Sequence, residues 1–264
     1  MKKQYSPTIT DYGTMNVCAL DREIISSPRA KSCGPIYSAS RSVAEPLAVS
    51  VREPLVSFLQ TRGISLVMDI GAGTGEFATR LRLSGYDHRI ISVEPIRGYY
   101  SRLRKHALAD PAWETVQCAL GDKDGIVEMA MPMESIPSGA RTGTAATVTT
   151  HDGDLHTEDV VMSRISTLIP AFRIEQEQIL IHLNVPGRER DILRGSRAVI
   201  DDISAFHIHV SLQHDSDGVS TIDEMTRTMK AMQFECVAIT PGTIDAATGT
   251  MRSASMTFAR PLQA

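Results

Sequence analysis

Hydrophobic and polar positions follow two periods along most of this chain. From residue 65 onward, short apolar runs of strand length alternate with segments in which apolar residues recur every three or four positions. The short runs are typical of buried strands, and the longer segments are typical of helices with one buried face. Strands and helices that alternate over short connections predict an α/β fold, in which helices cover both faces of a mostly parallel sheet.

The same pattern sets the bounds of the expected elements. Strands are predicted at residues 65–70, 89–94, 115–120, 126–129, 178–185, 205–212, 235–239 and 254–259. Helices are predicted at 45–62, 74–83, 99–108, 188–200 and 220–232. Residues 131–159 are rich in Pro, Gly, Ser and Thr, which indicates a loop or an irregular pair of strands. Residues 1–44 are expected to form an irregular arm, either disordered or folded as a lid, ahead of a single domain at 45–264.

The glycine-rich turn after the first predicted strand carries the main chemical signal. Residues 69–75 read Asp-Ile-Gly-Ala-Gly-Thr-Gly and lead directly into a predicted helix. Glycines at alternate positions let the backbone turn sharply and let a ligand lie against bare main chain. The N-terminus of the following helix adds free N–H groups and the positive end of its dipole. The alternative is a strand-to-helix turn that binds no ligand.

Glu94 indicates which ligand binds there. It ends the second predicted strand, where a carboxylate can accept hydrogen bonds from both ribose hydroxyls of an adenosine. Nicotinamide dinucleotides and S-adenosylmethionine both contain that group. The spacing G-x-G-x-G, with Asp69 two positions before Gly71, differs from the dinucleotide pattern G-x-G-x-x-G. It favours S-adenosylmethionine, whose cationic amino group Asp69 is expected to hold.

Composition narrows the class of protein and its partners. The 264 residues are 42% hydrophobic and 22% charged, with a net charge of -4 and no basic run, so nucleic acid is not expected as a partner. The four cysteines form no C-x-x-C pair, which fits a reduced, cytoplasmic protein. The first twenty residues hold no apolar leader, and no apolar run is long enough to cross a bilayer. Membrane association is therefore not expected, while a homo-oligomer stays open.

From about residue 60 onward the chain resembles the FkbM-type methyltransferases, a class I family that uses S-adenosylmethionine. The similar segments are 69–75, Val-Glu-Pro at 93–95, 113–125, 161–168 and 183–195. The resemblance implies a Rossmann-like, seven-stranded sheet and O-methylation of small metabolites such as sugars or polyketides. It also implies a cofactor site made of Asp69, Gly71, Ala72, Gly73, Gly75, Glu76, Phe77, Glu94, Pro95, Cys118, Ala119, Leu120 and Asp122.

The chain departs from the family where the acceptor is expected. The family pattern Lys-x-Asp-x-Glu-Gly is replaced by His-Leu-Asn-Val-Pro-Gly at 182–187, and a glutamate on the next strand is replaced by His209. His182 and Asn184 share one face of their strand, as His207 and His209 do on the neighbour. A neutral imidazole can take a proton near pH 7, so the predicted catalytic residues are His182, His209 and Asn184. The alternative is that these histidines are hydrogen-bonded core residues.

The loss of carboxylates also favours an anionic acceptor. No carboxylate or cysteine completes a metal site around the histidine pairs, so no metal is predicted. The expected activity is methyl transfer from S-adenosylmethionine to a hydroxyl, or to another heteroatom, of a small molecule. Two other functions stay open, namely a nicotinamide-dependent oxidoreductase and a cofactor-binding module without catalysis.

Overall fold

The structure is a computed structural model that describes residues 54–132, 155–172, 177–212 and 220–261. These residues belong to one compact unit, Arg52–Ala264. The predicted arm at 1–44 and most of the predicted loop at 131–159 lie outside the described residues.

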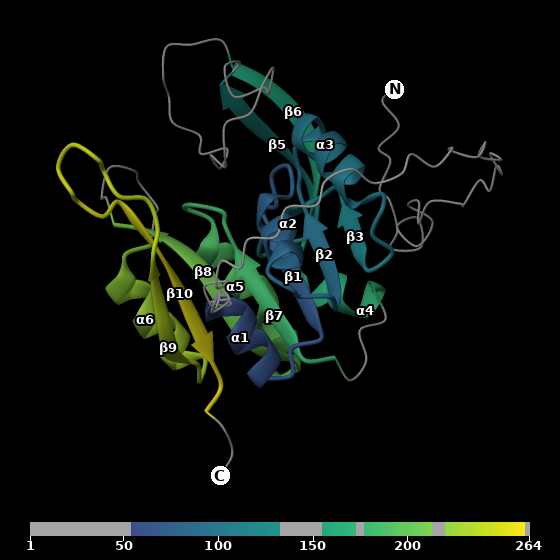
Figure 1. Ribbon diagram of the computed structural model, residues 1–264. Helices are drawn as coiled ribbons and strands as arrows, with labels where there is room; N and C mark the ends of the chain where they lie inside the picture. Colours follow the sequence, from purple (N-terminus) through teal and green to yellow (C-terminus); the bar gives the residue numbers. More distant parts are fainter. Residues whose placement is uncertain (1–53, 133–154, 173–176, 213–219, 262–264) are drawn as a thin grey trace, which may run out of the picture. The chain divides into compact units, whose positions relative to one another are not determined.

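A seven-stranded sheet forms the centre of this unit (Figure 1). In spatial order its strands are β3 (Trp113–Val116), β2 (Arg89–Val93), β1 (Leu66–Ile70), β7 (Ile179–Leu183), β8 (Ile203–Ser211), β10 (Ser253–Ala259) and β9 (Glu235–Pro241). Neighbours from β3 to β8 pair in parallel, and β10 runs antiparallel to both β8 and β9. The predicted Rossmann-like architecture, with its antiparallel hairpin at the end of the chain, is confirmed.

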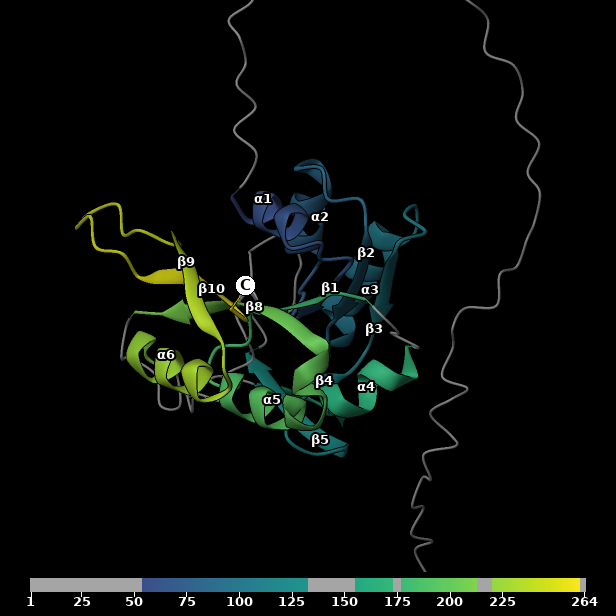
Figure 2. The ribbon, with the colours of Figure 1, turned by 90° about the horizontal axis from the view of Figure 1, so that it is seen from below.

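Helices cover both faces of the sheet, as Figure 2 shows from below. One face is covered by α1 (Pro54–Thr61), α2 (Glu76–Leu83) and α3 (Arg97–Ala107). The other is covered by α4 (Ile165–Ala171), α5 (Glu189–Ser196) and α6 (Ile222–Ala231), and the 3-10 helix η3 (Arg197–Asp202) follows α5. Each side of the central strands meets helices, so β1 and β7 are buried at every position, including the polar residues Asp69 and His182.

A second sheet contains β4 (Ala119–Leu120), β6 (Leu155–Ser163) and β5 (Gly125–Pro132). β5 and β6 pair antiparallel, while β4 pairs in parallel with β6. The single strand predicted at 115–120 is therefore wrong. β3 stops at Val116, and residues 119 and 120 pair with β6 instead of continuing beside β2. The helix α4 was not predicted at all, and its short apolar sequence contains Pro170.

Candidate functional site

The candidate site lies at the carboxyl edge of the sheet, where β2, β1 and β7 end side by side. Ile70 at the end of β1 pairs with Val93 on one side and Leu183 on the other. The glycine loop that follows β1 is fixed to both neighbours. The N–H of Gly71 donates to the carbonyl of Val93 at 3.0 Å, and a Cβ on Gly71 would lie 2.4 Å from the carbonyl oxygen of Asn184. Open α/β sheets bind ligands at this edge.

The loop turns through left-handed backbone at each of its glycines, with φ of 77° at Gly71, 60° at Gly73 and 99° at Gly75. Only glycine adopts this region without steric cost. Gly75 then occupies the N-cap of α2, where it offers no side chain to the first helical N–H groups. The loop therefore presents bare main chain and a helix N-terminus toward the carboxyl edge.

Glu94 bonds directly to this loop. Its Oε2 accepts the N–H of Gly73 at 2.8 Å, and its Oε1 accepts the N–H of Ile96 at 3.0 Å. The side chain is 5% exposed. Burial, assisted by the charges of Asp69 and Glu158, raises the pKa of Glu94 to about 7, although the two N–H donors oppose the shift. A carboxylate still has acceptor positions left after two hydrogen bonds, so Glu94 can accept further donors.

Asp69 lies deeper, one residue inside the edge of β1. Its side chain is fully buried, and both oxygens have protein partners. Nδ1 of His182 lies 2.8 Å from Oδ1, and Oγ of Ser92 donates to Oδ2 at 3.2 Å. These contacts follow from register, because Asp69 pairs with Ser92 on β2 and with His182 on β7. A ligand does not reach Asp69 in this conformation, and its predicted contact with an amino group stays a prediction.

The polar row continues across the same face of the sheet. The indole Nε1–H of Trp113 donates to Oγ of Ser92 at 2.9 Å. On the other side, His182 pairs with His207, whose Nδ1 lies 2.9 Å from Oγ1 of Thr257. Burial, together with neighbouring His182 and Arg80, lowers the pKa of His207 to about 3, so its imidazole is neutral near pH 7.

The ring of Phe77 covers this row from α2. It stacks on the imidazole of His182 with centroids 3.6 Å apart and an interplanar angle of 11°. Sequence reasoning placed Phe77 at the cofactor. In the structure its ring lies 3.6 Å from His182 and 6.0 Å from His207, and the guanidinium of Arg80 lies 5.5 Å from its centroid. Ser92, Trp113 and Thr257 were not identified from the sequence, although the period-two alternation put Ser92 and His207 on predictable faces.

Asn184 and His209 each lie two residues nearer the carboxyl edge than the paired residues His182 and His207. His209 is half-buried, and burial lowers its pKa, with a smaller contribution from His182. Its Nδ1 lies 3.5 Å from Oγ of Ser255. Asn184 is half-buried at the end of β7, and its N–H donates to the carbonyl of Ile70 at 3.0 Å. The three predicted catalytic residues therefore occupy neighbouring strands at one edge, but His182 pairs with His207 rather than with His209.

The remaining predicted cofactor residues border this edge. Ala72, Ala119 and Leu120 are buried, while Pro95 is half-buried and Glu76 is exposed. Burial raises the pKa of the Cys118 thiol to about 12, so this cysteine is an inert apolar side chain. Asp122 is exposed and forms an ion pair with Arg194 at 3.2 Å. Within the described ranges, no cluster of three His, Cys, Asp or Glu side chains is arranged to hold a metal ion.

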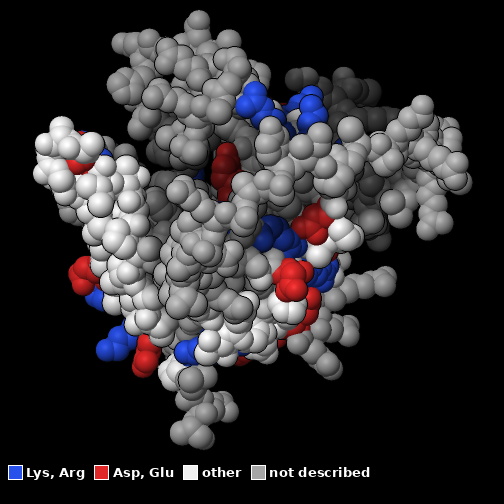
Figure 3. Space-filling model, in the orientation of Figure 1, with Lys and Arg blue, Asp and Glu red and all other residues white. Residues whose placement is uncertain are grey.

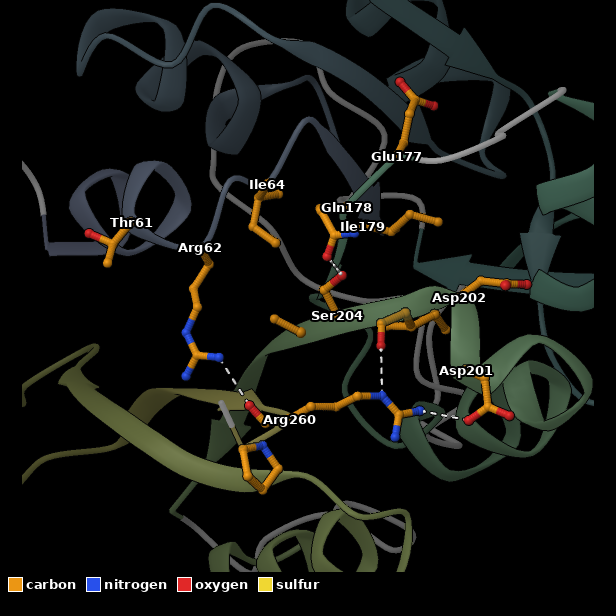
Figure 4. A pocket seen from close by; sticks show the side chains of 13 residues that line it. Thr61, Arg62, Ile64, Glu177, Gln178, Ile179, Asp201, Asp202, Ser204 and Arg260 are labelled. Carbon is orange, nitrogen blue, oxygen red and sulfur yellow. Dashed lines mark hydrogen bonds and ion pairs between the residues drawn. The ribbon is translucent and has the colours of Figure 1, made fainter. Parts of the chain in front are cut away.

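A separate cavity of about 490 Å³ lies at the opposite, amino end of β7 and β8 (Figure 4). Its polar side chains bond to one another and to the chain. Nη1 of Arg62 donates to the carbonyl of Arg260 at 3.0 Å, and Nη2 of Arg260 contacts Asp201 at 3.1 Å.

On the face drawn in Figure 3, acidic and basic side chains lie beside one another. Among the described helices, none has the length and apolar character needed to cross a membrane.

Comparison with known proteins places the chain in a family. The family model described as the methyltransferase FkbM domain matches residues 69–236, which is more than half of the chain. No curated protein matches.

Several solved structures have a similar fold at low identity. The 1,6-didemethyltoxoflavin-N1-methyltransferase of Burkholderia thailandensis is 14% identical at a TM-score of 0.44, over 80% of this chain and 78% of that one. Magnesium protoporphyrin IX methyltransferase from Synechocystis is 8% identical at a TM-score of 0.44, over 78% of this chain and 76% of that one. A SAM-dependent methyltransferase from Aquifex aeolicus is 10% identical at a TM-score of 0.42, over 81% of this chain and 94% of that one. The family match spans the glycine loop, Glu94 and the histidines of β7 and β8, and the chain belongs to the FkbM methyltransferase family.

Proposed function

We propose that this protein transfers a methyl group from S-adenosylmethionine to a hydroxyl of a small metabolite. The observation that carries the proposal is the bond between Glu94 and the glycine loop. A buried carboxylate at the end of β2 meets left-handed backbone at the end of β1, within 2.8 Å of the N–H of Gly73. This arrangement supports the proposal, because a carboxylate at that position could accept the ribose hydroxyls while the ligand lies against the glycine loop.

The chemistry of the site fits that cofactor. Glu94 would bind the ribose, and the glycine loop would lie along the methionyl part. Because the side chains of Cys118 and Leu120 point into the apolar core, we expect the main chain of this segment, and not these side chains, to border the adenine. When bound, S-adenosylmethionine supplies a methyl group on a reactive sulfonium. The protein then needs to orient an acceptor oxygen and to receive its proton.

The histidines of β7 and β8 are the proposed proton acceptors. His182 and His209 lie on one face of adjacent strands, at the edge that also holds Glu94. Asn184 is proposed to bind the acceptor through its side-chain amide. The family's carboxylates are absent from these positions, which supports an anionic acceptor, for example one with a carboxylate or phosphate group. The tailoring of natural products or sugars is the proposed setting.

Thermal unfolding tests the cofactor assignment. S-adenosylmethionine and S-adenosylhomocysteine should each raise the Tm, because a ligand that binds the native state stabilises it. NAD and NADP should leave the Tm unchanged. Glu94→Ala is the control, and it should weaken cofactor binding by roughly tenfold to a hundredfold, because it removes a charged acceptor of two hydroxyl hydrogen bonds. Equal stabilisation by a dinucleotide would contradict the proposal.

A screen of hydroxylated metabolites, with S-adenosylhomocysteine release as the signal, tests the reaction itself. Acceptors that carry a carboxylate or phosphate should react faster than their neutral analogues. Methylation only of amines would overturn the hydroxyl assignment. A protein that binds the cofactor tightly but methylates nothing in such a screen would instead fit a binding module without catalysis.

A further inference from the structure

The carboxylate of Asp69 holds an imidazole at the carboxyl edge. We propose that Asp69 is a positioning residue for His182, which it fixes in the tautomer whose Nε2 can receive the proton of the acceptor hydroxyl. This inference rests on the proposed function and adds a role to it. It differs from the role of binding the cofactor's amino group that the resemblance implies for Asp69.

The hydrogen-bonded row fixes where each hydrogen lies. The indole nitrogen of Trp113 can only donate, so Oγ of Ser92 accepts from it at 2.9 Å. The single hydroxyl hydrogen of Ser92 is then directed to Oδ2 of Asp69 at 3.2 Å. This leaves Oδ1 for His182. Because a carboxylate only accepts, Nδ1 of His182 carries a hydrogen across the 2.8 Å contact, and Nε2 of the neutral ring carries the lone pair.

Packing holds the plane of this ring. Phe77 stacks on one side at 3.6 Å, and α2, which carries Phe77, begins directly after the glycine loop. His207 lies 5.5 Å from the ring of His182 at an angle of 28° and has its own partner in Thr257. The ring therefore cannot turn without displacing α2 or breaking its contact with Asp69.

Nε2 of His182 has no hydrogen-bond partner among the described residues, whereas Nδ1 is held by Asp69. The side chain is 7% exposed, so the proposal requires the acceptor hydroxyl to approach this nitrogen from the carboxyl edge. His182 is next to last in β7, beside the loop that ends β1. An unpaired acceptor atom at a ligand-binding edge is suited to receive a proton.

The transfer step balances with this assignment. As the acceptor oxygen forms its bond to the methyl carbon, the carbon–sulfur bond breaks and its electron pair stays on sulfur. Nε2 of His182 takes the hydroxyl proton. The resulting imidazolium lies 2.8 Å from the Asp69 carboxylate, which stabilises its charge, and it later returns the proton to water. The products are the methyl ether and S-adenosylhomocysteine.

Asp69→Asn separates this role from cofactor binding, since asparagine keeps the shape of the side chain but not its charge. S-adenosylhomocysteine affinity, measured by calorimetry, should stay within about threefold of the wild type. The rate of single-turnover methylation should fall by roughly 10²-fold or more, the scale on which a base in the wrong tautomer slows a reaction. Long-range proton–nitrogen NMR spectra should show hydrogen on Nδ1 of His182 in the wild type and a changed tautomer distribution in the variant.

Thr257→Val is the matched control. It removes the partner of the adjacent buried imidazole, His207, on the same face of the sheet and leaves Asp69 untouched, so turnover and the His182 spectrum should stay as in the wild type. The NMR measurement on the wild type needs neither a variant nor an acceptor, and hydrogen on Nε2 of His182 there would overturn the proposal. A tenfold or greater loss of S-adenosylhomocysteine affinity in Asp69→Asn, with turnover kept at saturating cofactor, would assign Asp69 to the cofactor instead. Wild-type protein that binds no S-adenosylhomocysteine would refute the proposed function itself.

Discussion

Two features of the surroundings of Glu94 act on its charge in opposite directions. It is nearly buried, which disfavours its charge, yet it accepts two backbone N–H groups that favour the charge. Burial dominates, and the pKa rises to about 7. Because the pKa of the folded state exceeds the ordinary value of 4.5, the free energy of unfolding of the ligand-free protein falls as the pH rises between these two values. In the ligand-free protein the ionised form of Glu94 is therefore destabilised, and hydrogen bonds donated by a ligand would stabilise it.

This balance predicts that cofactor affinity depends on pH near neutrality. Between pH 8 and pH 6 the ionised fraction of Glu94 falls from about nine-tenths to about one-tenth, so the Kd for S-adenosylhomocysteine should rise up to about tenfold. Calorimetry at four pH values measures it. Glu94→Gln should bind more weakly at pH 8 and should lose this dependence, while any titration of the ligand itself would persist in the variant. An unchanged slope in Glu94→Gln would show that Glu94 is not the titrating group.

At the scale of elements, the glycine loop is wedged between the ends of β2 and β7. A methyl group on Gly71 would lie 2.4 Å from the backbone oxygen of Asn184, and that backbone cannot move alone because its N–H bonds to Ile70. The φ of 77° adds strain for any residue with a Cβ. The loop therefore tolerates only glycine at this point, for a packing reason that is independent of the cofactor.

Gly71→Ala should consequently destabilise the protein by about 2–4 kcal/mol, as strain and a backbone clash add. It should also weaken S-adenosylhomocysteine binding by tenfold or more, because the loop must shift. Gly63→Ala is the control, since Gly63 has a similar φ of 62° but nothing within 4 Å of its Cβ position. It should cost about 1–2 kcal/mol and leave affinity unchanged. Urea unfolding measures the stability and calorimetry measures the affinity. Equal losses of both in the two variants would show that the close approach of Gly71 to the Asn184 backbone has no effect of its own.

The elements themselves were largely predictable, because the buried strands consist of continuous apolar runs. What the pattern could not show is which strand pairs with which. Residues 115–120 look like one strand, yet Val116 pairs with β2 and Ala119 pairs with β6. Glu94 and the glycine loop could be placed at one edge because parallel strands end together. The contact of Asp69 with Ser92 and His182 could not be predicted from the sequence, since it depends on the register between strands that are far apart in the chain.

At the scale of the whole described unit, the two faces of the sheet differ in chemistry. The face under α4, α5 and α6 is a continuous apolar cluster. The face under α1, α2 and α3 carries the polar row from Trp113 to Thr257 within its own apolar cluster. Buried polar groups are tolerated when each has a partner, and this row supplies one to every member. The residues of the proposed site are therefore concentrated on one face and at one edge.

The amino end of the sheet should contribute stability alone. Arg260 joins three elements there (Figure 4). Its Nε donates to the carbonyl of Ile203 at 3.3 Å. Its Nη2 donates to the carbonyl of Ile200 at 2.7 Å, and its guanidinium lies 4.7 Å from the centroid of the Phe234 ring. These contacts fix η3 and the start of β8 against the end of β10, at the opposite end of the strands from Glu94.

Arg260→Met keeps the apolar stem but leaves those carbonyls without their charged donor, so it should lower the free energy of unfolding by about 2 kcal/mol. Arg62→Met removes the 3.0 Å hydrogen bond to the Arg260 carbonyl and the guanidinium that lies 5.7 Å from the centroid of the Phe58 ring, and it should cost about half as much. Both folded variants should bind S-adenosylhomocysteine within twofold of the wild type, because the cavity beside them lies at the opposite end of the strands from the proposed cofactor site. Urea unfolding followed by calorimetry measures the two effects on the same samples. A tenfold loss of affinity in Arg260→Met, without a matching loss in Arg62→Met, would mean that the amino-end cavity takes part in ligand binding and that function is not confined to the carboxyl edge.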